Sequence, residues 1–394
     1  LETGKAIWES RLECDHAVTT FHIAAEEATR IDGEIVPLDG TESGSGRLGE
    51  VRRFPIGPVA AITPFSSPLS IVAHKVAPAL AAGNSVLVKP SPDTPLSALS
   101  VGRAVLDAAA ELDIPAGVIS VVPCANDVVE PLVTDPRVRL LSFTGSSRIG
   151  WALRALAGQK RVTLELGGNG AVIVHSDADI ELAAGRCTRD AFLLSGQSCA
   201  SVQRIYAHES IADAFTRILV NHAEGLTTGD PREEATQVGP MRSEEEAKRA
   251  ADWLDEAAAA GAQVMCGGTR DGHLFRPTVI SGTQHHMRIV CEEVFAPIVV
   301  VERYSELDEA ITAANSSAYG LQAGIFSNDL EAVYRAYRDL EVGAVIVNDT
   351  NSWRADHTPY GGVKSSGLGR EGVRYAIREQ TEPRMLVLNT GARA

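Results

Sequence analysis

The sequence contains no uninterrupted apolar run of about 20 residues, the length that a membrane-spanning helix requires. A long apolar stretch over residues 69–82 is interrupted by His74 and Lys75. The first residues are polar and lack the apolar core of a signal peptide, and the chain starts with Leu rather than Met. We therefore expect a cytoplasmic location without membrane contact, in a chain that is a fragment or a processed form.

Paired cysteines are also missing. The six cysteines occur singly, without a C-x-x-C pair or the spacing of a zinc site. They stand at positions 14, 124, 187, 199, 266 and 291. The plainest interpretation of each is a buried, reduced thiol. The adjacent His285 and His286 lack a nearby Cys or carboxylate ladder, so we expect no metal site.

Clusters of positive charge are absent as well. The formal net charge is -15 and the Lys and Arg residues are scattered, so the surface would repel a phosphate backbone and nucleic-acid binding is disfavoured. An apolar content of 44% is typical of a soluble globular protein. The 394 residues are too many for one ordinary core and predict two or three domains.

Segments with strand and helix patterns alternate between residues 59 and 168. The expected strands are 59–63, 85–90, 117–123, 139–145 and 162–168, and the expected helices lie near 68–82, 96–111 and 146–157. Continuous apolar strands separated by helices predict a parallel sheet that is covered on both faces. Ligands of such sheets bind beyond the carboxyl ends of the strands, so we expect a site in the loops that follow them.

A second alternation over residues 171–348 predicts a second α/β domain. The expected strands are 171–174, 203–208, 298–304, 323–326 and 344–348, and the expected helices are 178–194, 209–224, 243–260, 306–316 and 329–340. Residues 35–53 and 383–389 are extended segments outside both patterns. Their exposed edges need a partner, which is either another subunit or another part of the same chain.

Cys199 stands apart from the other cysteines through its surroundings, LLSGQSCAS. A long apolar helix ends there, Gly196 permits a tight turn, and small polar residues follow. A thiol on such a turn is a candidate nucleophile, although spacing alone favours an inert buried thiol. A catalytic thiol also needs an activator, because the thiolate is the reactive species.

Two further segments lie where strands of the first pattern end. Glu165 precedes a Gly-Gly pair in VTLELGGNG, where partial desolvation would raise its pKa toward the range of a general base. A solvated strand-end Glu is the alternative. In SFTGSSRIG a strand ends at Gly145 and Ser146 and a helix begins, which makes a candidate phosphate site without a G-x-G-x-x-G pattern. The alternative there is a Ser-capped helix start.

Together, these segments resemble the aldehyde dehydrogenase superfamily over nearly the whole chain. The motifs that carry the resemblance are VAHKVAPALAAGNSVLVKPS, SFTGSSRIG, LELGGNG, GQSC, EEVFAP and PYGGVKSSGLGREG. The resemblance implies an α/β fold with a Rossmann-like cofactor domain, an α/β catalytic domain and a small β oligomerisation element. The implied boundaries are 1–34 with 54–167 for the cofactor domain, 168–362 for the catalytic domain, 35–53 with 383–390 for the oligomerisation strands, and 363–382 for a return segment on the cofactor domain. The opening LETGKAIWESRLE matches a helix that a further N-terminal segment precedes in relatives, so we expect that segment to be missing.

The resemblance implies that Cys199 is the nucleophile and Glu165 the general base. A thiolate would add to the carbonyl, a hydride would pass to the nicotinamide, and water would cleave the thioester. Family members usually carry an Asn at the position of Ser66, and its amide donates to the oxyanion beside the Cys backbone N–H. Removing one such donor typically costs about 100- to 1,000-fold in rate. We expect that Ser66 replaces the amide in part or that a neighbouring group takes over.

The cofactor site is also implied by matching positions. These are Thr63, Pro64, Phe65, Lys89, Ser91, Gly145, Ser146, Leu166, Glu293 and Phe295. Lys89 matches the lysine at the adenosine ribose, and Glu293 with Phe295 matches the pair at the nicotinamide ribose and ring. NAD-preferring members commonly place a Glu where this chain has Pro92. Without that carboxylate Ser91 can donate to a 2′-phosphate, so we expect NAD or NADP, with NADP tolerated or preferred.

The segment WRADHTPYGG is similar to branches of the family that act on small polar or anionic aldehydes. Lactaldehyde, succinate semialdehyde, phosphonoacetaldehyde and aromatic aldehydes are among them. Arg354 in this segment can pair with a carboxylate or phosphonate of the substrate, or be a surface residue at the tunnel rim. Arg189, ten residues before Cys199, is a weaker second candidate.

Two alternatives to a hydrolytic enzyme stay open. A coenzyme A-acylating relative would pass the acyl group to a thiol, but that branch generally lacks the base at Glu165. A catalytically impaired relative would be a structural or binding protein, as Ser66 and the missing N-terminal segment suggest. Residues 35–53 and 383–389 match the strands through which relatives pair subunits, so a homodimer or homotetramer is expected, with a small aldehyde as ligand.

Overall fold

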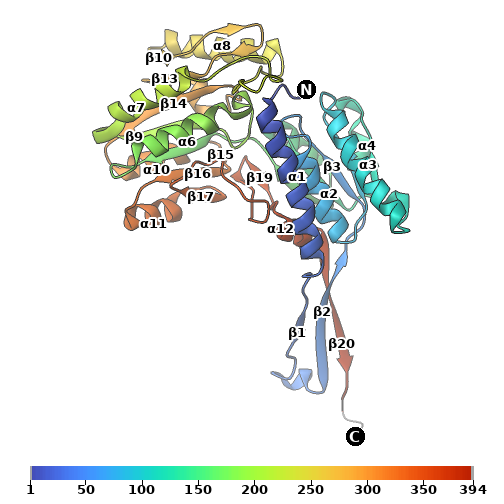
Figure 1. The fold of residues 1–394 in the computed structure, drawn as a ribbon. Coiled ribbons are helices and arrows are strands. Elements are labelled where there is room, and N and C mark those ends of the chain that lie inside the picture. Colours follow the sequence, from blue (N-terminus) through green and yellow to red (C-terminus); the bar gives the residue numbers. More distant parts are fainter. Residues whose placement is uncertain (1, 392–394) are drawn as a thin grey trace.

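The computed structural model describes residues 2–391, which form two α/β lobes and a projecting arm (Figure 1). The first lobe is built on a six-stranded sheet, the second lobe on a seven-stranded sheet, and the arm is a three-stranded sheet. This architecture confirms the predicted fold class, which combines a Rossmann-like part, a second α/β part and a small β element.

The first lobe contains the parallel sheet that the sequence predicts over residues 59–168. Its strands are β3 (Val59–Ile62), β4 (Val86–Lys89), β5 (Ile119–Val121), β6 (Leu140–Thr144), β7 (Arg161–Glu165) and β19 (Gly367–Leu368). Their spatial order is β19-β7-β6-β3-β4-β5, and β19 alone runs antiparallel to its neighbour. Apolar clusters occupy both faces of the sheet, which explains why its strands are continuous apolar runs.

Helices from both ends of the chain cover the first lobe. They are α1 (Ile7–Ala28), α2 (Ser70–Ala81), α3 (Pro95–Glu111), α5 (Ser147–Leu156) and α12 (Val373–Glu379). Both α1 and α12 pack against α2, through an apolar cluster that includes Ala24, Ala77 and Ile377. The C-terminal part of the chain therefore returns to the first lobe.

The seven-stranded sheet of the second lobe includes β10 (Gln263–Cys266) and β13 (Thr278–Ser281), which the sequence does not predict; the two-residue strands of the chain are likewise unpredicted. Both β10 and β13 are only four residues long. Most of β10 is exposed, and β13 lies directly between Pro277 and Gly282. Neither strand therefore shows the long apolar run that marks the central strands.

The remaining elements of the second lobe agree with the predicted alternation. Its other strands are β8 (Gly170–Val174), β9 (Val202–His208), β14 (Ile298–Tyr304), β16 (Gln322–Phe326) and β17 (Ala344–Val347). The spatial order is β10-β13-β14-β9-β8-β16-β17, and β10 alone is antiparallel to its neighbour. The helices are α6 (Ile180–Phe192), α7 (Glu209–Glu224), α8 (Glu244–Ala259), α10 (Leu307–Asn315) and α11 (Leu330–Asp339). Separate apolar clusters join α6 with α7 and α10 with α11 to this sheet.

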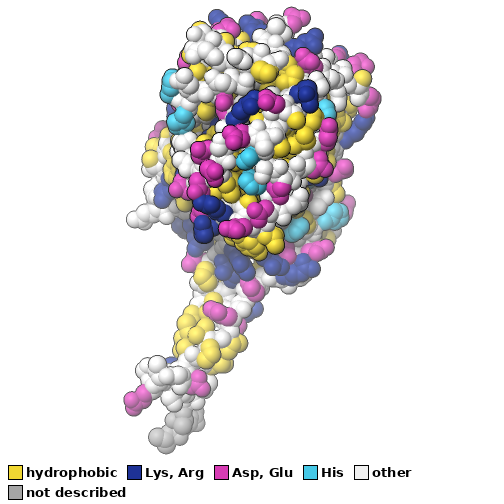
Figure 2. Space-filling view, turned by 90° about the vertical axis from the view of Figure 1, so that its left-hand side faces the viewer, with side chains coloured by type: hydrophobic (Ala, Val, Ile, Leu, Met, Phe, Trp, Pro, Cys, Tyr) yellow, Lys and Arg dark blue, Asp and Glu magenta, His cyan; other side chains and the backbone are white. Residues whose placement is uncertain are grey.

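The arm consists of β1 (Glu34–Val36), β2 (Arg47–Pro55) and β20 (Thr381–Asn389), which extend away from both lobes (Figure 1). The strands pair antiparallel in the order β1-β2-β20. The two extended segments of the sequence therefore pair within the chain. Apolar side chains nevertheless remain exposed along the arm, as Figure 2 shows.

Short elements complete the fold. They are α4 (Glu130–Thr134), α9 (Arg288–Cys291), β11 (Arg270–Asp271), β12 (Leu274–Phe275), β15 (Tyr319–Gly320) and β18 (Val363–Lys364). Pairing of β15 with β18 joins the second lobe to the returning C-terminal segment. Within residues 2–391, no helix has both the length and the apolar character needed to cross a bilayer.

Candidate active site

A cavity of about 560 Å³ lies between the carboxyl ends of the first-lobe strands and the second lobe. The loops after β3, β4, β6 and β7 supply one wall, and residues after α6 and α9 supply the other. All the residues that the sequence predicts for catalysis and cofactor binding line this cavity. They are Thr63, Pro64, Phe65, Ser66, Lys89, Ser91, Gly145, Ser146, Glu165, Leu166, Cys199, Glu293 and Phe295. The structure thus brings them together where ligands of parallel sheets bind, while their individual roles stay predictions.

Cys199 follows a turn with a left-handed backbone, Leu193–Gly196. Leu194, Ser195 and Gly196 have φ angles of 52°, 55° and 69°. Residues other than glycine are uncommon in this region. A Cβ at Gly196 would lie 2.1 Å from a backbone carbonyl oxygen, so only glycine fits at this point of the turn.

Both lobes anchor this turn. The N–H of Leu194 donates to a carboxylate oxygen of Glu9, in α1, at 2.6 Å. The hydroxyl of Ser195 donates to the carbonyl of Gly239 at 2.6 Å. The side chain of Gln197 donates to the Leu194 carbonyl at 3.2 Å. Together these hydrogen bonds stabilise the left-handed backbone of the turn, which would otherwise be unfavourable.

The thiol of Cys199 is protonated in the resting site. Burial raises its pKa to about 11, and the hydrogen bond with Tyr360, at 3.6 Å between Oη and Sγ, opposes this rise. Smaller influences contribute to the same value, because the carboxylates of Glu293 and Glu165 raise this pKa and the charge of Arg354 lowers it. Because only the thiolate is reactive, the nucleophile needs a base.

Glu165 is the last residue of β7 and is only 3% exposed. Among the described residues, neither of its carboxylate oxygens has a hydrogen-bond partner. Burial, and next the charge of Glu371, raises the pKa of Glu165 well above its ordinary value, against the opposing charges of Lys75 and Arg354. A carboxylate with free oxygens and a raised pKa, in the cavity that holds a thiol, can act as a general base.

A buried ion pair that the sequence did not predict, Lys75 with Glu371, acts on the charge of Glu165. The ammonium of Lys75 lies 3.2 Å from a Glu371 oxygen and donates to the hydroxyl of Ser142 at 2.9 Å. Burial alone would raise the pKa of Glu371, but Lys75 and Arg354 outweigh it and hold that pKa below its ordinary value. The available signal was the Lys inside the apolar stretch of α2, because a fully buried Lys requires a partner.

Ser66 lies after β3, half-buried in the cavity wall that it shares with Cys199. Its hydroxyl can donate one hydrogen bond into the cavity. The side chain is shorter than the amide that the family pattern has at this position. Position 66 is thus compatible with an oxyanion donor of shorter reach.

The helix α5 presents a free N-terminus to the cavity. Ser146 occupies its N-cap, and the Ser146 side chain makes no capping hydrogen bond. The hydroxyls of Thr63 and Thr144 are buried in the same wall and have no partner among residues 2–391. Unpartnered donors at a positive helix end fit a phosphate-bearing cofactor.

Lys89 and Ser91 follow β4 at the same edge. Burial lowers the pKa of Lys89, whose side chain lines the cavity. A carboxylate is nevertheless present one residue after Pro92, because Asp93 accepts a hydrogen bond from the Ser91 hydroxyl at 3.5 Å. Asp93 is paired with Arg242 at 2.7 Å, which offsets its repulsion of a 2′-phosphate.

Glu293 and Phe295 bring the second lobe into the cavity wall. Glu293 accepts a hydrogen bond from the Gly168 N–H at 2.9 Å, and burial raises its pKa to about 7. Phe295 has a left-handed φ of 52°, and its ring meets the Phe65 ring edge-to-face with centroids 6.2 Å apart. A carboxylate beside two aromatic rings suits a ribose hydroxyl and a flat heterocycle.

Arg354 is neither a free surface residue nor a residue of this cavity wall. Its side chain is 23% exposed, and its guanidinium lies 4.0 Å from the centroid of the Tyr360 ring. One of its terminal nitrogens lies 3.1 Å from His74 Nε2, and the guanidinium lies 3.7 Å from Glu371. The structure therefore places this cation behind the tyrosine that touches Cys199.

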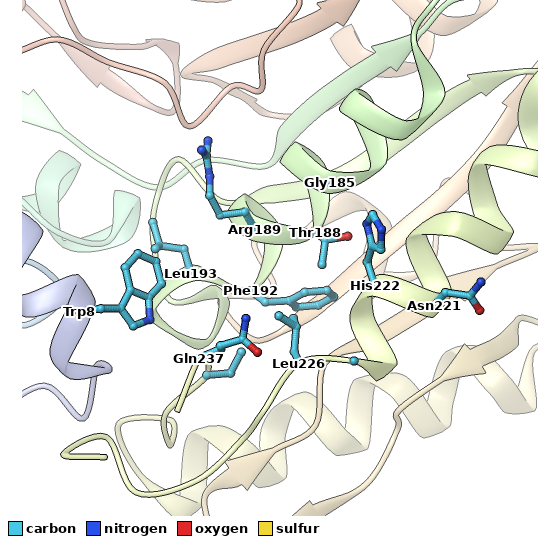
Figure 3. A pocket seen from close by; sticks show the side chains of 12 residues that line it. Trp8, Gly185, Thr188, Arg189, Phe192, Leu193, Asn221, His222, Leu226 and Gln237 are labelled. Atoms are coloured by element: carbon cyan, nitrogen blue, oxygen red, sulfur yellow. The ribbon is translucent and has the colours of Figure 1, made fainter. Parts of the chain in front are cut away.

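Arg189, the weaker substrate candidate, belongs to a second cavity of about 640 Å³. Figure 3 shows the residues that line it, among them Trp8 of α1 and Phe192 of α6. The guanidinium of Arg189 pairs with Asp190 at 2.7 Å. Cys199 does not line this cavity, so the structure does not bring Arg189 to the predicted site.

Comparison with known proteins places this fold among the oxidoreductases. The model of the Aldehyde dehydrogenase family matches residues 1–386. A 3-sulfolactaldehyde dehydrogenase of Priestia megaterium is 46% identical over 98% of this chain and 81% of its own length. A lactaldehyde dehydrogenase of Methanocaldococcus jannaschii is 38% identical over 99% of this chain and 82% of its own length. The chain belongs to the aldehyde dehydrogenase family.

Solved structures agree with this assignment. Aldehyde dehydrogenase 21 from Physcomitrella patens, in complex with the reaction product succinate, superposes with a TM-score of 0.96 at 42% identity, covering 99% of this chain and 81% of that one. A glyceraldehyde-3-phosphate dehydrogenase from Methanocaldococcus jannaschii, complexed with NADP, superposes with a TM-score of 0.94 at 38% identity, covering 98% and 83%.

Proposed function

We propose that this chain oxidises an aldehyde to a carboxylic acid with NAD or NADP as the hydride acceptor. One observation carries the proposal: a thiol, Cys199, and a carboxylate with two unpartnered oxygens, Glu165, line the same cavity. The dehydrogenases to which the chain is similar support the same assignment.

The side chains support a covalent route. The thiolate of Cys199 attacks the aldehyde carbon, which forms a C–S bond and an oxyanion. Bound NAD(P) would supply the acceptor for the hydride that leaves as this oxyanion collapses to a thioester. Glu165 then takes a proton from water, the water oxygen attacks the thioester, and the C–S bond breaks to release the acid. The raised pKa of Glu165 suits this role, because general-base catalysis is most efficient when the pKa of the base lies close to the operating pH.

We assign the cofactor to the first lobe, with residues 1–34 and 54–167 as its domain, and the nucleophile to a catalytic domain over 168–362. The free N-terminus of α5 at Ser146 would hold the pyrophosphate, and Lys89 would meet the adenosine ribose. Arg242 pairs with Asp93 and so offsets the repulsion of a 2′-phosphate near Ser91, which supports NADP as tolerated or preferred. Solved relatives complexed with NADP and with NAD+ support the use of either cofactor.

We infer a small polar or anionic aldehyde as the substrate. Arg354 is a cation one aromatic ring away from the nucleophile, because it stacks on Tyr360, whose hydroxyl touches Cys199. Its positive charge lies behind that ring in a buried setting, where it favours an anionic substrate through its electric field rather than by direct contact. The lactaldehyde and 3-sulfolactaldehyde dehydrogenases among the relatives, and the neighbour that holds succinate, support this class.

The experiment is to measure reduced cofactor with both NAD and NADP and a panel of aldehydes, with Cys199→Ala as the control. We expect lactaldehyde, 3-sulfolactaldehyde or succinate semialdehyde to be oxidised faster than propanal, and the variant to be inactive. No reduction with any aldehyde would contradict the proposal and favour a catalytically impaired structural or binding protein. Acyl-coenzyme A formed on addition of coenzyme A would instead favour an acylating enzyme.

We further propose that the chain assembles as a homodimer or homotetramer through the arm, with residues 35–53 and 383–390 as the oligomerisation strands. Four consecutive apolar residues of β20 are at least 44% exposed, so both faces of the strand are apolar. They are Met385, Leu386, Val387 and Leu388. A strand of this kind is normally covered by a partner. Light scattering should show an oligomer of the wild type that Leu386→Asp dissociates. Leu112→Asp, at the exposed C-cap of α3, should leave the oligomer intact, and a wild-type monomer would contradict the proposal.

A further inference from the structure

We propose that Tyr360 is a catalytic residue whose hydroxyl donates a hydrogen bond to the sulfur of Cys199 and stabilises its thiolate. The hydroxyl oxygen lies 3.6 Å from Sγ, within range of a hydrogen bond to sulfur. Across residues 2–391, Sγ is the one hydrogen-bond partner of this hydroxyl. The inference rests on the proposed function, in which Cys199 is the nucleophile.

The ring of Tyr360 is held in place from the backbone and from its face. Tyr360 and Glu371 exchange two backbone hydrogen bonds, at 3.1 and 2.7 Å, in an antiparallel bridge. The guanidinium of Arg354 covers the ring at 4.0 Å and pairs with the carboxylate of Glu371 at 3.7 Å. Tyr360 is 5% exposed, so bulk water does not compete for its hydroxyl. A donor fixed in this way needs little rearrangement when charge develops on the sulfur.

The charges that face Sγ show why a donor is needed. After burial, the charges of Glu293 and Glu165 raise the pKa of the Cys199 thiol and so disfavour the thiolate. The Tyr360 hydrogen bond and the charge of Arg354 lower this pKa and favour the thiolate. Burial raises the pKa of the Tyr360 phenol well above its ordinary value, so the phenol keeps its proton. A thiolate carries no proton, so its hydrogen bond can run only from Tyr360 to the sulfur. The cation on the ring face also draws electron density from the ring, which strengthens the O–H as a donor.

A plainer role for Tyr360 is an aromatic wall, which would depend on the ring and not on the hydroxyl. Tyr360→Phe separates the two roles, because it keeps the ring and its stacking on Arg354 and removes only the donor. Tyr304→Phe is the matched control. Tyr304 is a buried tyrosine of another apolar cluster in the second lobe, and its hydroxyl bonds His175 at 2.7 Å.

The measurement is the rate at which iodoacetamide alkylates Cys199 in the full chain, as a function of pH. Cys199→Ala corrects for the other cysteines. We expect Tyr360→Phe to move the midpoint of thiolate formation upward by about one pH unit, because hydrogen bonds to charged groups have energies of that order. We also expect kcat/KM to fall about tenfold, with kcat affected more than KM. Tyr304→Phe should superimpose on the wild type.

An unchanged alkylation midpoint, with kcat/KM within about twofold of the wild type, would overturn the proposal. Thermal unfolding checks that Tyr360→Phe is folded. If it is not, 3,5-difluorotyrosine at position 360 is the second probe, since its more acidic phenol should lower the midpoint, and no shift would overturn the proposal. Alkylation requires neither aldehyde nor cofactor. A wild type that is alkylated at Cys199 but oxidises no aldehyde would therefore contradict the proposed function alone.

Discussion

The ammonium of Lys75 and the carboxylate of Glu371 form a buried ion pair at 3.2 Å. After burial, Glu371 is the main influence that raises the pKa of Glu165. A fixed negative charge near the candidate base therefore adjusts the pH at which that base can act.

Replacing Glu371 with Gln should lower the pKa of Glu165, because burial remains while the neighbouring negative charge is removed. The basic form of Glu165 would then be present at lower pH, so the acidic limb of the kcat–pH profile should move to lower pH. The variant should also lose about 3–5 kcal/mol of unfolding free energy, because Lys75 keeps a buried charge without its partner. Steady-state kinetics and urea unfolding measure both effects; an acidic limb that stays in place would contradict the coupling.

Glu165→Gln should separate thioester formation from thioester hydrolysis. The amide has the shape of the carboxylate but cannot accept a proton from water. We expect a burst of about one reduced cofactor per site in stopped-flow absorbance, followed by turnover about 100- to 10,000-fold slower than in the wild type. Normal steady-state turnover would show that Glu165 is not the base. A variant without a burst would show that Glu165 also deprotonates Cys199.

Substitutions of Ser66 test whether its hydroxyl donates a hydrogen bond to the oxyanion. Ser66→Asn should raise kcat and Ser66→Ala should lower it, with a span between them of up to about 100- to 1,000-fold. The neighbouring Ser67→Ala is the matched control and should leave kcat close to that of the wild type. If neither substitution at position 66 changes turnover, the oxyanion donor lies elsewhere.

Asp356 bridges two histidines, with one oxygen 3.1 Å from His16 Nδ1 and the other 3.1 Å from His74 Nε2. Burial alone would raise the pKa of Asp356, but the hydrogen bonds from His16 and His74 outweigh it and hold this pKa below its ordinary 3.8. The ionised carboxylate therefore stabilises the fold fully above the unfolded-state pKa. That stabilisation is lost as the pH falls from 3.8 toward the lower folded-state pKa.

Asp356→Asn should consequently lower the free energy of unfolding at neutral pH by about 2–4 kcal/mol. Below pH 3.8 the wild type should lose this advantage, so the two stability curves should converge as the solution becomes more acidic. Urea unfolding over a pH series measures the difference. If the stability curves of the wild type and the variant stayed parallel over the pH series, the ionised Asp356 would not be the source of the stabilisation.

Local sequence patterns predict most of the fold and part of the site. The strands of both lobes are apolar runs, and Cys199 and Glu165 stand out through a glycine turn and a strand end. The partners of these residues cannot be predicted in this way. Tyr360 is 161 positions from Cys199, and Glu371 is 296 positions from Lys75. No pattern around either residue encodes its partner, because the contact depends on how the lobes and the return segment pack.

The same limit explains why short strands and the position of Arg354 were not predicted. Short strands such as β10 are defined by the neighbour with which they pair, and a pattern of four mostly exposed residues does not reveal that neighbour. The charge of Arg354 suggested either a substrate contact or an exposed position. Its stacking on Tyr360 and its contact with His74 became visible only in three dimensions.

The carboxylate of Glu9 accepts hydrogen bonds from the N–H of Ala6, just before its own helix, and from the N–H of Leu194 in the turn before the nucleophile. The two lobes are therefore not interchangeable modules. A chimera of two relatives would keep this anchor only where its α1 supplies a carboxylate at the position of Glu9. For the same reason, a substitution in α1 can impair catalysis without touching any reacting atom.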